Sequence, residues 1–264
     1  MNLRTLEKFR TKYGPYALVA GASEGLGAAY AEALAKRGLN LVLIARKKDA
    51  LEAFGKAIRE KYPVEVICLS ADTGDYEKTK NLVTALDVSI GLLVYNAAYC
   101  PVGLFEEISE ERLAQVVAVN VKAPLLLARL LSQKMIENRR GGIVLMSSLA
   151  GTQGSPKLVS YAASKSFNAI LAEGLWQELK PHGVDVIACV AGAILTPGYR
   201  QAQQAKAPGT LTAPEVAEAA LKALGKYPIV VPGGVNKLAR FFMGRLLPRS
   251  LAIKLMSANT GSLT

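Results

Sequence analysis

The stretch Tyr16-Ala-Leu-Val-Ala20-Gly21-Ala-Ser-Glu-Gly25-Leu-Gly27 decides the fold class. Its first five residues form an apolar run bounded by turn residues, which predicts a buried strand. Three glycines follow, and the alanine-rich segment 28–37 then predicts a helix with Gly38 as its C-cap. A glycine-rich turn between a strand and a helix lets the backbone approach a pyrophosphate, which the helix N-terminus favours electrostatically. The spacing is not G-x-G-x-x-G, so the glycines could also serve packing alone.

The alternation of strands and helices continues along the chain. Strands are expected at 39–45, 64–70, 90–95, 142–147, 184–190 and 229–231, and helices at 3–13, 49–61, 76–85, 109–135 with a bend near Pro124, 160–179 and 212–224. Such alternation predicts βαβ units and a parallel sheet. Residues 193–211 are expected to form a lid-like loop. We therefore expect a single α/β domain of the doubly wound Rossmann type at 1–232, with a small helical, basic and apolar extension at 233–264 packed on it.

The composition describes a soluble globular protein, with 264 residues, 51% of them hydrophobic and 20% charged. The longest uncharged run, 88–105, is interrupted by glycine, asparagine and proline and makes a poor membrane span. Residues 1–12 lack the apolar region of a secretory signal. The three cysteines, Cys68, Cys100 and Cys189, fit buried thiols in a reducing compartment better than disulfides or a zinc site. A cytoplasmic protein without a metal is expected.

The net charge of +11 is concentrated at the C-terminus, because residues 219–264 hold seven bases and no acid. No nucleic-acid-binding motif accompanies them, so an anionic ligand or a membrane surface is a better partner than DNA. Residues 236–256 mix five of these bases with many large apolar side chains. This segment could be a pair of short helices over the substrate cleft or a partner subunit, or an amphipathic membrane-surface helix. Apolar residues occur on both sides of Arg245, which favours the covering role.

Arg46 ends the second predicted strand, 19 residues beyond Gly27. An acid at this place would bind a ribose 2′-hydroxyl, whereas an arginine accommodates a 2′-phosphate. Lys47 and Lys48 follow, and Ser23 offers a hydroxyl nearby. The pattern predicts NADPH rather than NADH; the alternative is a solvated charge run that opens a helix.

Tyr161 and Lys165 are four residues apart in a predicted helix and therefore share a face. An ammonium beside a phenol favours the phenolate. Bringing a pKa of ~10 to the working pH requires about 4 kcal/mol of differential interaction, while one exposed lysine supplies only ~1 kcal/mol. The pair would need a partly dry pocket and another cation. By itself it is as consistent with an ordinary surface pair.

Several motifs, in order and spacing, resemble those of the short-chain dehydrogenases/reductases over residues 14 to about 225. They are the turn Gly21–Gly27, Tyr95-Asn96-Ala97-Ala98, Asn120, Ser148, and Tyr161-Ala-Ala-Ser-Lys165. The resemblance implies one Rossmann domain with a seven-stranded parallel sheet and a small-molecule carbonyl or alcohol substrate. It also implies homodimers or homotetramers formed through the helices at 109–135 and 160–179.

The resemblance assigns catalytic roles to four residues. Tyr161 is the general acid that protonates the carbonyl oxygen, and Lys165 holds the nicotinamide ribose and lowers the pKa of that tyrosine. Ser148 polarises the carbonyl, and Asn120 anchors a proton-relay water. Ser147 is the neighbour that could be confused with Ser148, but the thirteen-residue distance to the tyrosine favours Ser148.

The resemblance also implies the residues that contact the cofactor: Gly21, Ser23, Glu24, Gly25, Leu26, Gly27, Arg46, Lys47, Asp72, Thr73, Asn96, Ala97, Ala98, Tyr161, Lys165, Ala191, Gly192, Ile194 and Thr196. Two positions depart from the family pattern, since Ala98 replaces a usual glycine and Ala191 a usual proline.

These observations predict an NADPH-dependent reductase that acts reversibly on a fairly apolar ketone or aldehyde. The substrate would be a steroid-like or acyl-chain carbonyl, because the start of the chain and Arg46 look most like the branch of hydroxysteroid dehydrogenases and beta-ketoacyl reductases. The alternative is a non-catalytic NADP-binding regulator or a membrane-peripheral scaffold.

Overall fold

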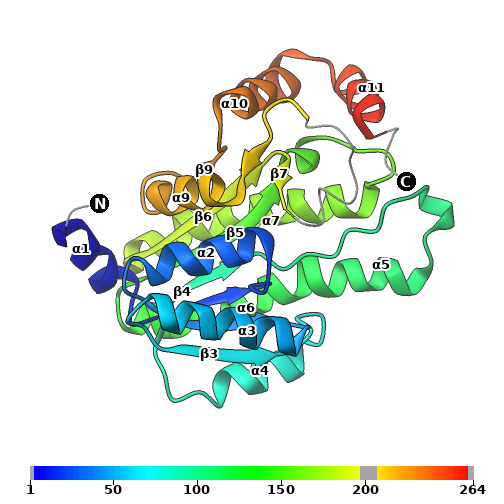
Figure 1. Ribbon diagram of the computed structural model, residues 1–264. Coiled ribbons are helices and arrows are strands. Elements are labelled where there is room, and N and C mark those ends of the chain that lie inside the picture. The colour runs from blue at the N-terminus through cyan, green and yellow to red at the C-terminus, as the bar shows by residue number, and fades with distance from the viewer. Residues whose placement is uncertain (1–2, 197–206, 261–264) are drawn as a thin grey trace.

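A seven-stranded parallel sheet forms the centre of the computed structural model, which describes residues 3–196 and 207–260 (Figure 1). The strand order is β3-β2-β1-β4-β5-β6-β9. The strands are β1 (Tyr16–Ala20), β2 (Asn40–Ala45), β3 (Val66–Ser70), β4 (Ile90–Tyr95), β5 (Gly141–Ser148), β6 (Val184–Ala191) and β9 (Ile229–Val230). The order reverses between β1 and β4, and ligands of open α/β sheets bind at the carboxyl ends of strands beside such a reversal. The predicted fold class is confirmed.

Helices cover both faces of the sheet (Figure 1). One core packs α2 (Gly25–Ala35), α3 (Lys48–Lys61) and α9 (Ala213–Ala223) on the sheet. The other packs α4 (Tyr76–Thr84), α6 (Ala123–Glu137) and α7 (Val159–Leu179). All residues of β1 and β4 are buried, which is why these strands read as unbroken apolar runs.

Helix α2 begins at Gly25, three residues before its predicted start, because the glycine-rich turn itself supplies the first helical residues. It ends at Ala35, and Gly38 then takes a φ of +77°, a conformation that glycine adopts without steric cost. Helix α1 (Leu3–Tyr13) extends from the domain at the N-terminus, as predicted (Figure 1).

The predicted long helix at 109–135 is two helices joined by a wide turn. Helix α5 (Glu110–Val117) passes through a π-helical turn, η2 (Ala118–Lys122), into α6. Pro124 explains the irregularity, because it has no N–H to donate to the carbonyl of Asn120 and its ring would clash with that carbonyl in a regular helix. The bend therefore lies just before Pro124, and it contains Asn120.

The predicted loop at 193–211 contains two short strands that sequence reasoning did not anticipate. Strand β7 (Ile194–Leu195) pairs in parallel with β8 (Leu211–Thr212), so the ends of the segment are tied together. Thr212 then begins α9 with the predicted capping box, in which its side chain and that of Glu215 satisfy each other's backbone N–H groups. The middle of the predicted lid, 197–206, lies outside the described residues.

The extension consists of α10 (Gly234–Phe241), a π-helical turn η5 (Phe242–Leu246) and α11 (Arg249–Thr260), which lie above the sheet in Figure 1. Helix α10 contacts η3 (Leu149–Thr152), the short helix after β5. On α11, the Arg249 side chain donates a hydrogen bond of 3.1 Å to the carbonyl of Thr152. The domain boundary at 232/233 stays a prediction.

Two of the three cysteines are at least partly buried. Cys189 is buried and Cys68 is partly buried, but Cys100 is exposed, contrary to the expectation of three buried thiols. Cys100 follows Tyr99 in a loop rather than a strand.

The helical stretch Glu110–Glu137 is, among the described residues, long and apolar enough to cross a membrane by length and composition alone. One such helix is weak support for a span, and α6 packs against β4 and β5 as a core helix does.

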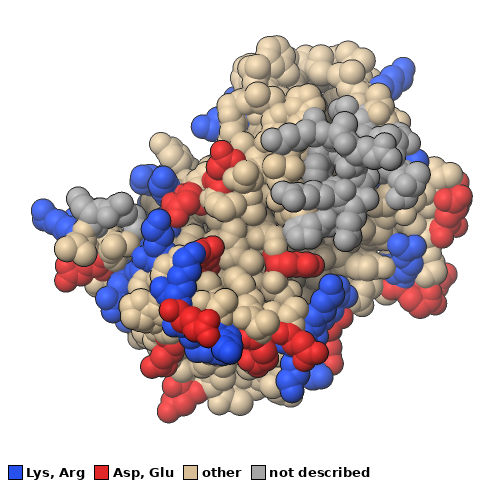
Figure 2. All heavy atoms as spheres, viewed as in Figure 1, with Lys and Arg blue, Asp and Glu red and all other residues tan. Residues whose placement is uncertain are grey.

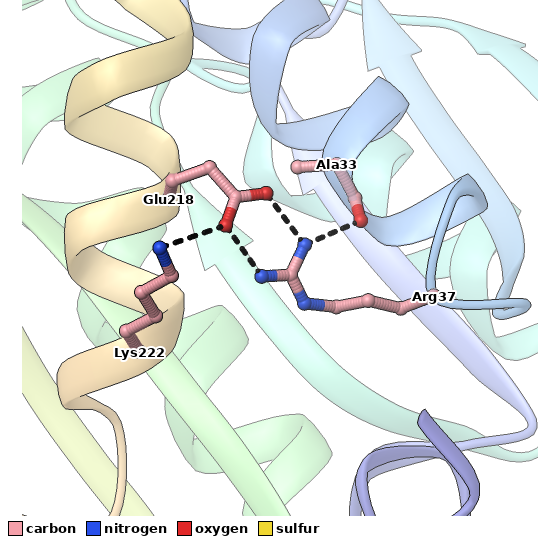
Figure 3. A network of polar contacts seen from close by, with 4 residues as sticks. All are labelled: Ala33, Arg37, Glu218 and Lys222. Carbon is pink, nitrogen blue, oxygen red and sulfur yellow. Dashed lines mark hydrogen bonds and ion pairs between the residues drawn. The ribbon is translucent and has the colours of Figure 1, made fainter. Parts of the chain in front are cut away.

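A partly buried ion pair joins the end of α2 to α9, two segments that are far apart in sequence (Figure 3). Arg37, only 4% exposed, follows α2 and donates two hydrogen bonds of 2.8 Å to the carboxylate of Glu218 on α9. It also donates to the carbonyl of Ala33 at 2.8 Å, and its guanidinium carbon lies 5.4 Å from the centre of the Phe9 ring. The guanidinium beside Glu218 holds the pKa of that carboxyl below its ordinary value of 4.5.

We expect Glu218→Ala to lower the free energy of unfolding by about 3 kcal/mol, because it leaves the Arg37 charge buried without its partner. Urea denaturation at neutral pH measures this loss. The contribution of Glu218 should be complete above its ordinary pKa and should disappear as the pH falls through its lowered value. Glu137→Ala, which removes an exposed pair with Lys134, is the control and should cost less than about 1 kcal/mol. Equal losses in the two variants would contradict the assignment.

Candidate active site

A cavity of about 440 Å³ opens at the carboxyl ends of the parallel strands, beside the reversal between β1 and β4. It is lined by every predicted cofactor residue except Gly27, and by Ser148, Tyr161 and Lys165. Asn120 does not line it. Residues that sequence reasoning missed also take part in the lining: Ile44, Ala45, Ala71, Tyr99, Val119, Met146 and Ser147. Most of them lie at or just after the end of a strand, close to predicted residues. Because the strand ends of a parallel sheet meet at one edge, their place at the cavity could have been inferred.

Two glycines of the turn are required by the chain's own packing. A Cβ on Gly27 would lie 1.8 Å from the carbonyl oxygen of Gly21, and a Cβ on Gly21 would lie 2.8 Å from the backbone of Ala97. The Asn96 side chain ties the same turn to the end of β4 by donating to the Gly21 carbonyl at 3.1 Å. Gly25, with a φ of +59°, lines the cavity at the N-terminus of α2. That helix end is where an anion is favoured.

The basic residues after β2 reach the same cavity. Arg46 and Lys47 both line it, and both are exposed. Within the described parts of the chain, no carboxylate forms an ion pair with either side chain. Arg46 and Lys47, which pair with no carboxylate among the described residues, lie at the same cavity as the N-terminus of α2. Together they favour a negatively charged ligand at this end of the cavity.

Asp72 has both carboxylate oxygens engaged within the chain. One accepts from the backbone N–H of Gly74 at 2.8 Å, and the other from the Gln115 side chain at 3.3 Å. The Asp72 carboxylate thereby links the loop after β3 to α5. Thr73, its neighbour, is 5% exposed and lines the cavity with it.

Tyr161, Lys165 and Ser148 meet at the other end of the cavity. Helix α7 carries the tyrosine and the lysine one turn apart, and the Lys165 Nζ atom lies 5.5 Å from the centre of the Tyr161 ring. Lys165 is 3% exposed and donates a hydrogen bond of 3.0 Å to the carbonyl of Met146 on β5. The Ser148 hydroxyl, at the end of that strand, is a hydrogen-bond partner of Tyr161. An acid, a hydroxyl donor and a cation are thus held around one point.

Ser147 and Ser148 have different surroundings although they are adjacent. The buried Ser147 hydroxyl donates to the backbone carbonyl of Lys165 at 2.7 Å, which fastens β5 to α7. Ser148 is the serine that bonds with the tyrosine, and its oxygen also accepts from the N–H of Ala150 at 3.2 Å. The alternation of side chains along a strand separates the two, so Ser148 is the serine available for chemistry.

Asn120 holds the wall of the site from behind. Its side-chain oxygen accepts from the N–H of Tyr99, and its amide donates to the carbonyl of Tyr99, both at 2.8 Å. The same amide donates to the Ser164 hydroxyl at 3.0 Å. These bonds use both amide N–H groups, so a water can reach Asn120 only through the second acceptor position of its side-chain oxygen or through its backbone carbonyl.

That backbone carbonyl is already partnered by a residue that sequence reasoning missed. The Asn168 side chain, 1% exposed on α7, donates to the Asn120 carbonyl at 3.0 Å. The bond takes the place of the helical N–H that Pro124 lacks. The side-chain oxygen of Asn168 is buried without a hydrogen-bond partner. The signal was present in the sequence, because Asn168 follows Lys165 by three residues and so lies on a neighbouring face of the helix.

Burial governs the electrostatics of the pair. It raises the pKa of Tyr161 well above its ordinary value; the nearby Cys100 adds to the rise, and the Ser148 hydrogen bond opposes it. Burial also lowers the pKa of Lys165 to about 8. The chain's own groups therefore do not bring the pKa of the tyrosine toward neutral pH, and the expected need for another cation beside the pair stands. A further positive charge next to the phenol is needed.

The loop after β4 and the loop before α7 bond to each other. The N–H of Gly103 donates to the carbonyl of Lys157 at 3.1 Å. Leu104, Phe105 and Val159, in or next to these loops, are 47%, 56% and 47% exposed. The two loops therefore present apolar side chains to solvent.

Comparisons with known proteins identify the family. The family model for short chain dehydrogenase matches residues 15–207. A 7beta-hydroxysteroid dehydrogenase of Clostridium sardiniense is 32% identical over 233 residues, which cover 87% of this chain and 89% of that protein. A very-long-chain 3-oxoacyl-CoA reductase of Phaeosphaeria nodorum is 34% identical over 190 residues, which cover 69% of this chain and 55% of the relative. The chain thus spans little more than half of the second protein.

Solved structures show the same architecture. A structure described in work on 7beta-hydroxysteroid dehydrogenase stereoselectivity has a TM-score of 0.89 and 28% identity, with 94% of this chain and 99% of that chain covered. A short-chain dehydrogenase from Sphingobium yanoikuyae in complex with NADPH has a TM-score of 0.76 and 29% identity, with 94% of each chain covered. The matched family model and the relative that is 32% identical over most of its length show that this chain belongs to the short-chain dehydrogenases, a family of oxidoreductases.

Proposed function

We propose that the protein is an NADPH-dependent reductase that converts a fairly apolar ketone or aldehyde into an alcohol, and reversibly oxidises that alcohol. The observation that carries the proposal is the meeting of Ser148, Tyr161 and Lys165 in the cavity that also contains the glycine-rich turn and Arg46. One end has the groups for proton transfer to a carbonyl, and the other suits a phosphorylated nucleotide. Such a division fits hydride transfer from a dinucleotide.

The residues divide the work as follows. When bound, NADPH supplies the hydride that reduces the carbonyl carbon. Ser148 donates a hydrogen bond that orients the carbonyl oxygen, and Tyr161 gives its phenolic proton to that oxygen as the alcohol forms. Lys165 lies beside the phenol and stabilises the resulting phenolate. Asn120 bonds to Tyr99 in the loop after β4 and to Ser164 on α7, and so holds that loop against the helix that carries Tyr161 and Lys165.

NADP(H) is favoured over NAD(H) by the charge at the end of β2. Arg46 and Lys47 are exposed at the cavity, whereas an acid there would select the 2′-hydroxyl of NADH. The NADPH complex of the Sphingobium yanoikuyae relative supports this cofactor. The predicted contacts of Asp72 and Thr73 with the adenine side and of Ile194 and Thr196 with the nicotinamide side are part of the proposal.

An apolar substrate is favoured by the exposed apolar side chains of Leu104, Phe105 and Val159, which lie near Tyr99 and Tyr161 in the sequence. The names of the relatives point to two kinds of carbonyl, a steroid ketone and a long-chain 3-oxoacyl thioester. A panel of steroid, acyl-thioester, quinone and small aldehyde substrates with NADPH would separate them.

Assembly and location belong to the same proposal. We retain the expected homodimer or homotetramer through the helices at 109–135 and 160–179, where Val117, Leu125 and Ile170 are 57%, 39% and 64% exposed. We also retain a cytoplasmic location with peripheral membrane contact through the extension. A non-catalytic NADP-binding regulator is the second candidate, and the complete set of Asn120, Ser148, Tyr161 and Lys165 argues against it.

Tyr161→Phe should reduce turnover at least ~100-fold, because it removes the general acid. Spectrophotometric assay of NADPH consumption measures the loss, and fluorescence titration should find NADPH affinity nearly unchanged. Tyr227→Phe, at an exposed position away from the cavity, is the control. If Tyr161→Phe leaves every reductase activity intact, the regulator becomes the better description.

Arg46→Asp should weaken NADPH binding roughly 10- to 100-fold and strengthen NADH binding, because a charge-assisted contact with the 2′-phosphate is replaced by repulsion. Titrations of both cofactors against both proteins measure the reversal. Lys56→Asp makes the same charge change on an exposed part of α3 and should leave the preference unaltered. Equal binding of the two cofactors by the native chain would refute the role of Arg46.

Lys165→Met should abolish turnover and yet stabilise the protein at pH 7. The folded chain holds the pKa of Lys165 at about 8, below its ordinary 10.5, so the protonated lysine destabilises the fold. This cost is complete below pH 8 and vanishes as the pH rises through 10.5. After subtraction of the lost hydrogen bond to Met146, the free energy of unfolding should rise by ~1–2 kcal/mol. Urea denaturation at pH 7 measures this gain. A gain that grew toward alkaline pH would contradict the assignment.

A further inference from the structure

The outward face of the C-terminal extension is apolar, the reverse of an ordinary surface helix. Val235, Leu238 and Phe241 on α10 are 56%, 58% and 47% exposed, and Phe242, which follows them, is 46% exposed. Their spacing of three and four residues places them on one side of the helix. Leu246, 56% exposed, continues the series through η5. Apolar side chains thus occupy the side of the helix that faces away from the domain.

The inner face of the extension is where it attaches to the domain. Asn236 is 3% exposed and donates hydrogen bonds of 3.0 Å to the carbonyls of Gly209 and Pro232. On α11, Ala252 is fully buried, while Leu251 and Leu255, four residues apart, are 43% and 46% exposed. The extension is therefore held by one side, and the outer apolar side is not needed for its packing.

Basic side chains lie on the domain side of the extension. Lys237, Arg240, Arg245 and Arg249 line a groove of about 590 Å³ between the extension and α7; Phe241 also lines it, and Glu173 is the one acid in its lining. No ion pair within 4.0 Å engages these four cations in the described parts of the chain. Burial, opposed by Glu173 and reinforced by Arg245, lowers the pKa of Arg240. In Figure 2 the region of α10 and α11 is mostly tan with a few blue side chains.

We propose that the extension docks the protein on an anionic phospholipid bilayer. The exposed apolar series enters the boundary between headgroups and acyl chains, and the lysine and arginines of the groove reach the lipid phosphates along their aliphatic stems. A second copy of the chain is a poorer occupant, because an isologous contact would bring together two faces that each hold four bases and one acid, Glu173. Arg245 has apolar residues on both sides in the sequence, and the structure separates them: the exposed Leu246 faces outward, whereas Met243 and Leu247 are half-buried.

Docking has a consequence that rests on the proposed function. Ser147 and Ser148 line both the cofactor cavity and the basic groove. The extension also contacts the loop after Ser148, through α10 and Arg249. A bilayer bound to the outer side of the extension would therefore be separated from the catalytic serine by the extension, and a bilayer is where apolar carbonyl compounds concentrate.

Sedimentation of the full chain with phospholipid vesicles tests the docking without reference to activity. Vesicles of phosphatidylcholine containing phosphatidylglycerol should bind the protein at least ~10-fold better than phosphatidylcholine alone, and added salt should weaken the binding. Tyr161→Phe should bind as the native chain does, so failure of the reductase proposal would not affect this result.

Two sets of variants separate the apolar and basic contributions. Binding should fall about 10-fold or more in the triple variant Leu238→Ser, Phe242→Ser, Leu246→Ser, and similarly in Arg240→Gln, Arg245→Gln, Arg249→Gln. The controls are Leu3→Ser and Tyr227→Ser for exposed apolar residues and Lys56→Gln, Lys78→Gln, Lys134→Gln for exposed bases. Circular dichroism and NADPH affinity verify that every variant folds.

Three results would overturn the proposal: no binding to either vesicle, equal binding to anionic and neutral vesicles, or equal losses in the variants and their controls. Sedimentation equilibrium in the absence of lipid tests whether this face is instead a contact between copies of the chain. If the Leu238, Phe242 and Leu246 substitutions lower the oligomeric mass in the absence of lipid, the face is a contact between copies of the chain and the membrane assignment is wrong.

Discussion

The burial of Lys165 is the constraint on which the site depends. A cation that is 3% exposed requires a partner, and the Met146 carbonyl at 3.0 Å accepts its hydrogen bond. Meeting this requirement fixes the distance between β5 and α7, which the Ser147 bond to the Lys165 carbonyl reinforces. Ser148 and Tyr161 are placed by the same two elements, so the geometry of the proton-transfer groups follows from holding one charge in a dry place.

The electrostatic result is a site that is unfavourable for its own charges. Burial moves the pKa of Lys165 down and that of Tyr161 up, so each shift opposes the charged form. A partner that brings positive charge to the phenol would reverse the second effect, and the nicotinamide ring of an oxidised dinucleotide is such a group. Stability and function are thus in conflict at this pair, as is common where a buried charge is kept for chemistry.

Asn120 and Pro124 show how a local irregularity connects three elements. Pro124 frees the Asn120 carbonyl by lacking an N–H, the helix widens into a π-turn, and the Asn168 amide from α7 satisfies the carbonyl. The widened turn directs the Asn120 side chain to the backbone of Tyr99 and to Ser164. One proline therefore allows α6, α7 and the loop after β4 to be joined by a single asparagine.

The sequence by itself determined the parallel sheet, the glycine-rich turn, the end of the first helix near Gly38, the capping box of Thr212 and most of the residues that line the cavity. These features are local or follow from strand order, because strand ends of a parallel sheet meet at one edge. Only the tertiary structure decided the direction of the pKa shifts, the separate tasks of Ser147 and Ser148, the bond from Asn168 to Asn120 and the outward turn of the apolar side of α10. Each of these depends on which groups packing brings together and which it leaves in water, and spacing along a chain carries no measure of burial.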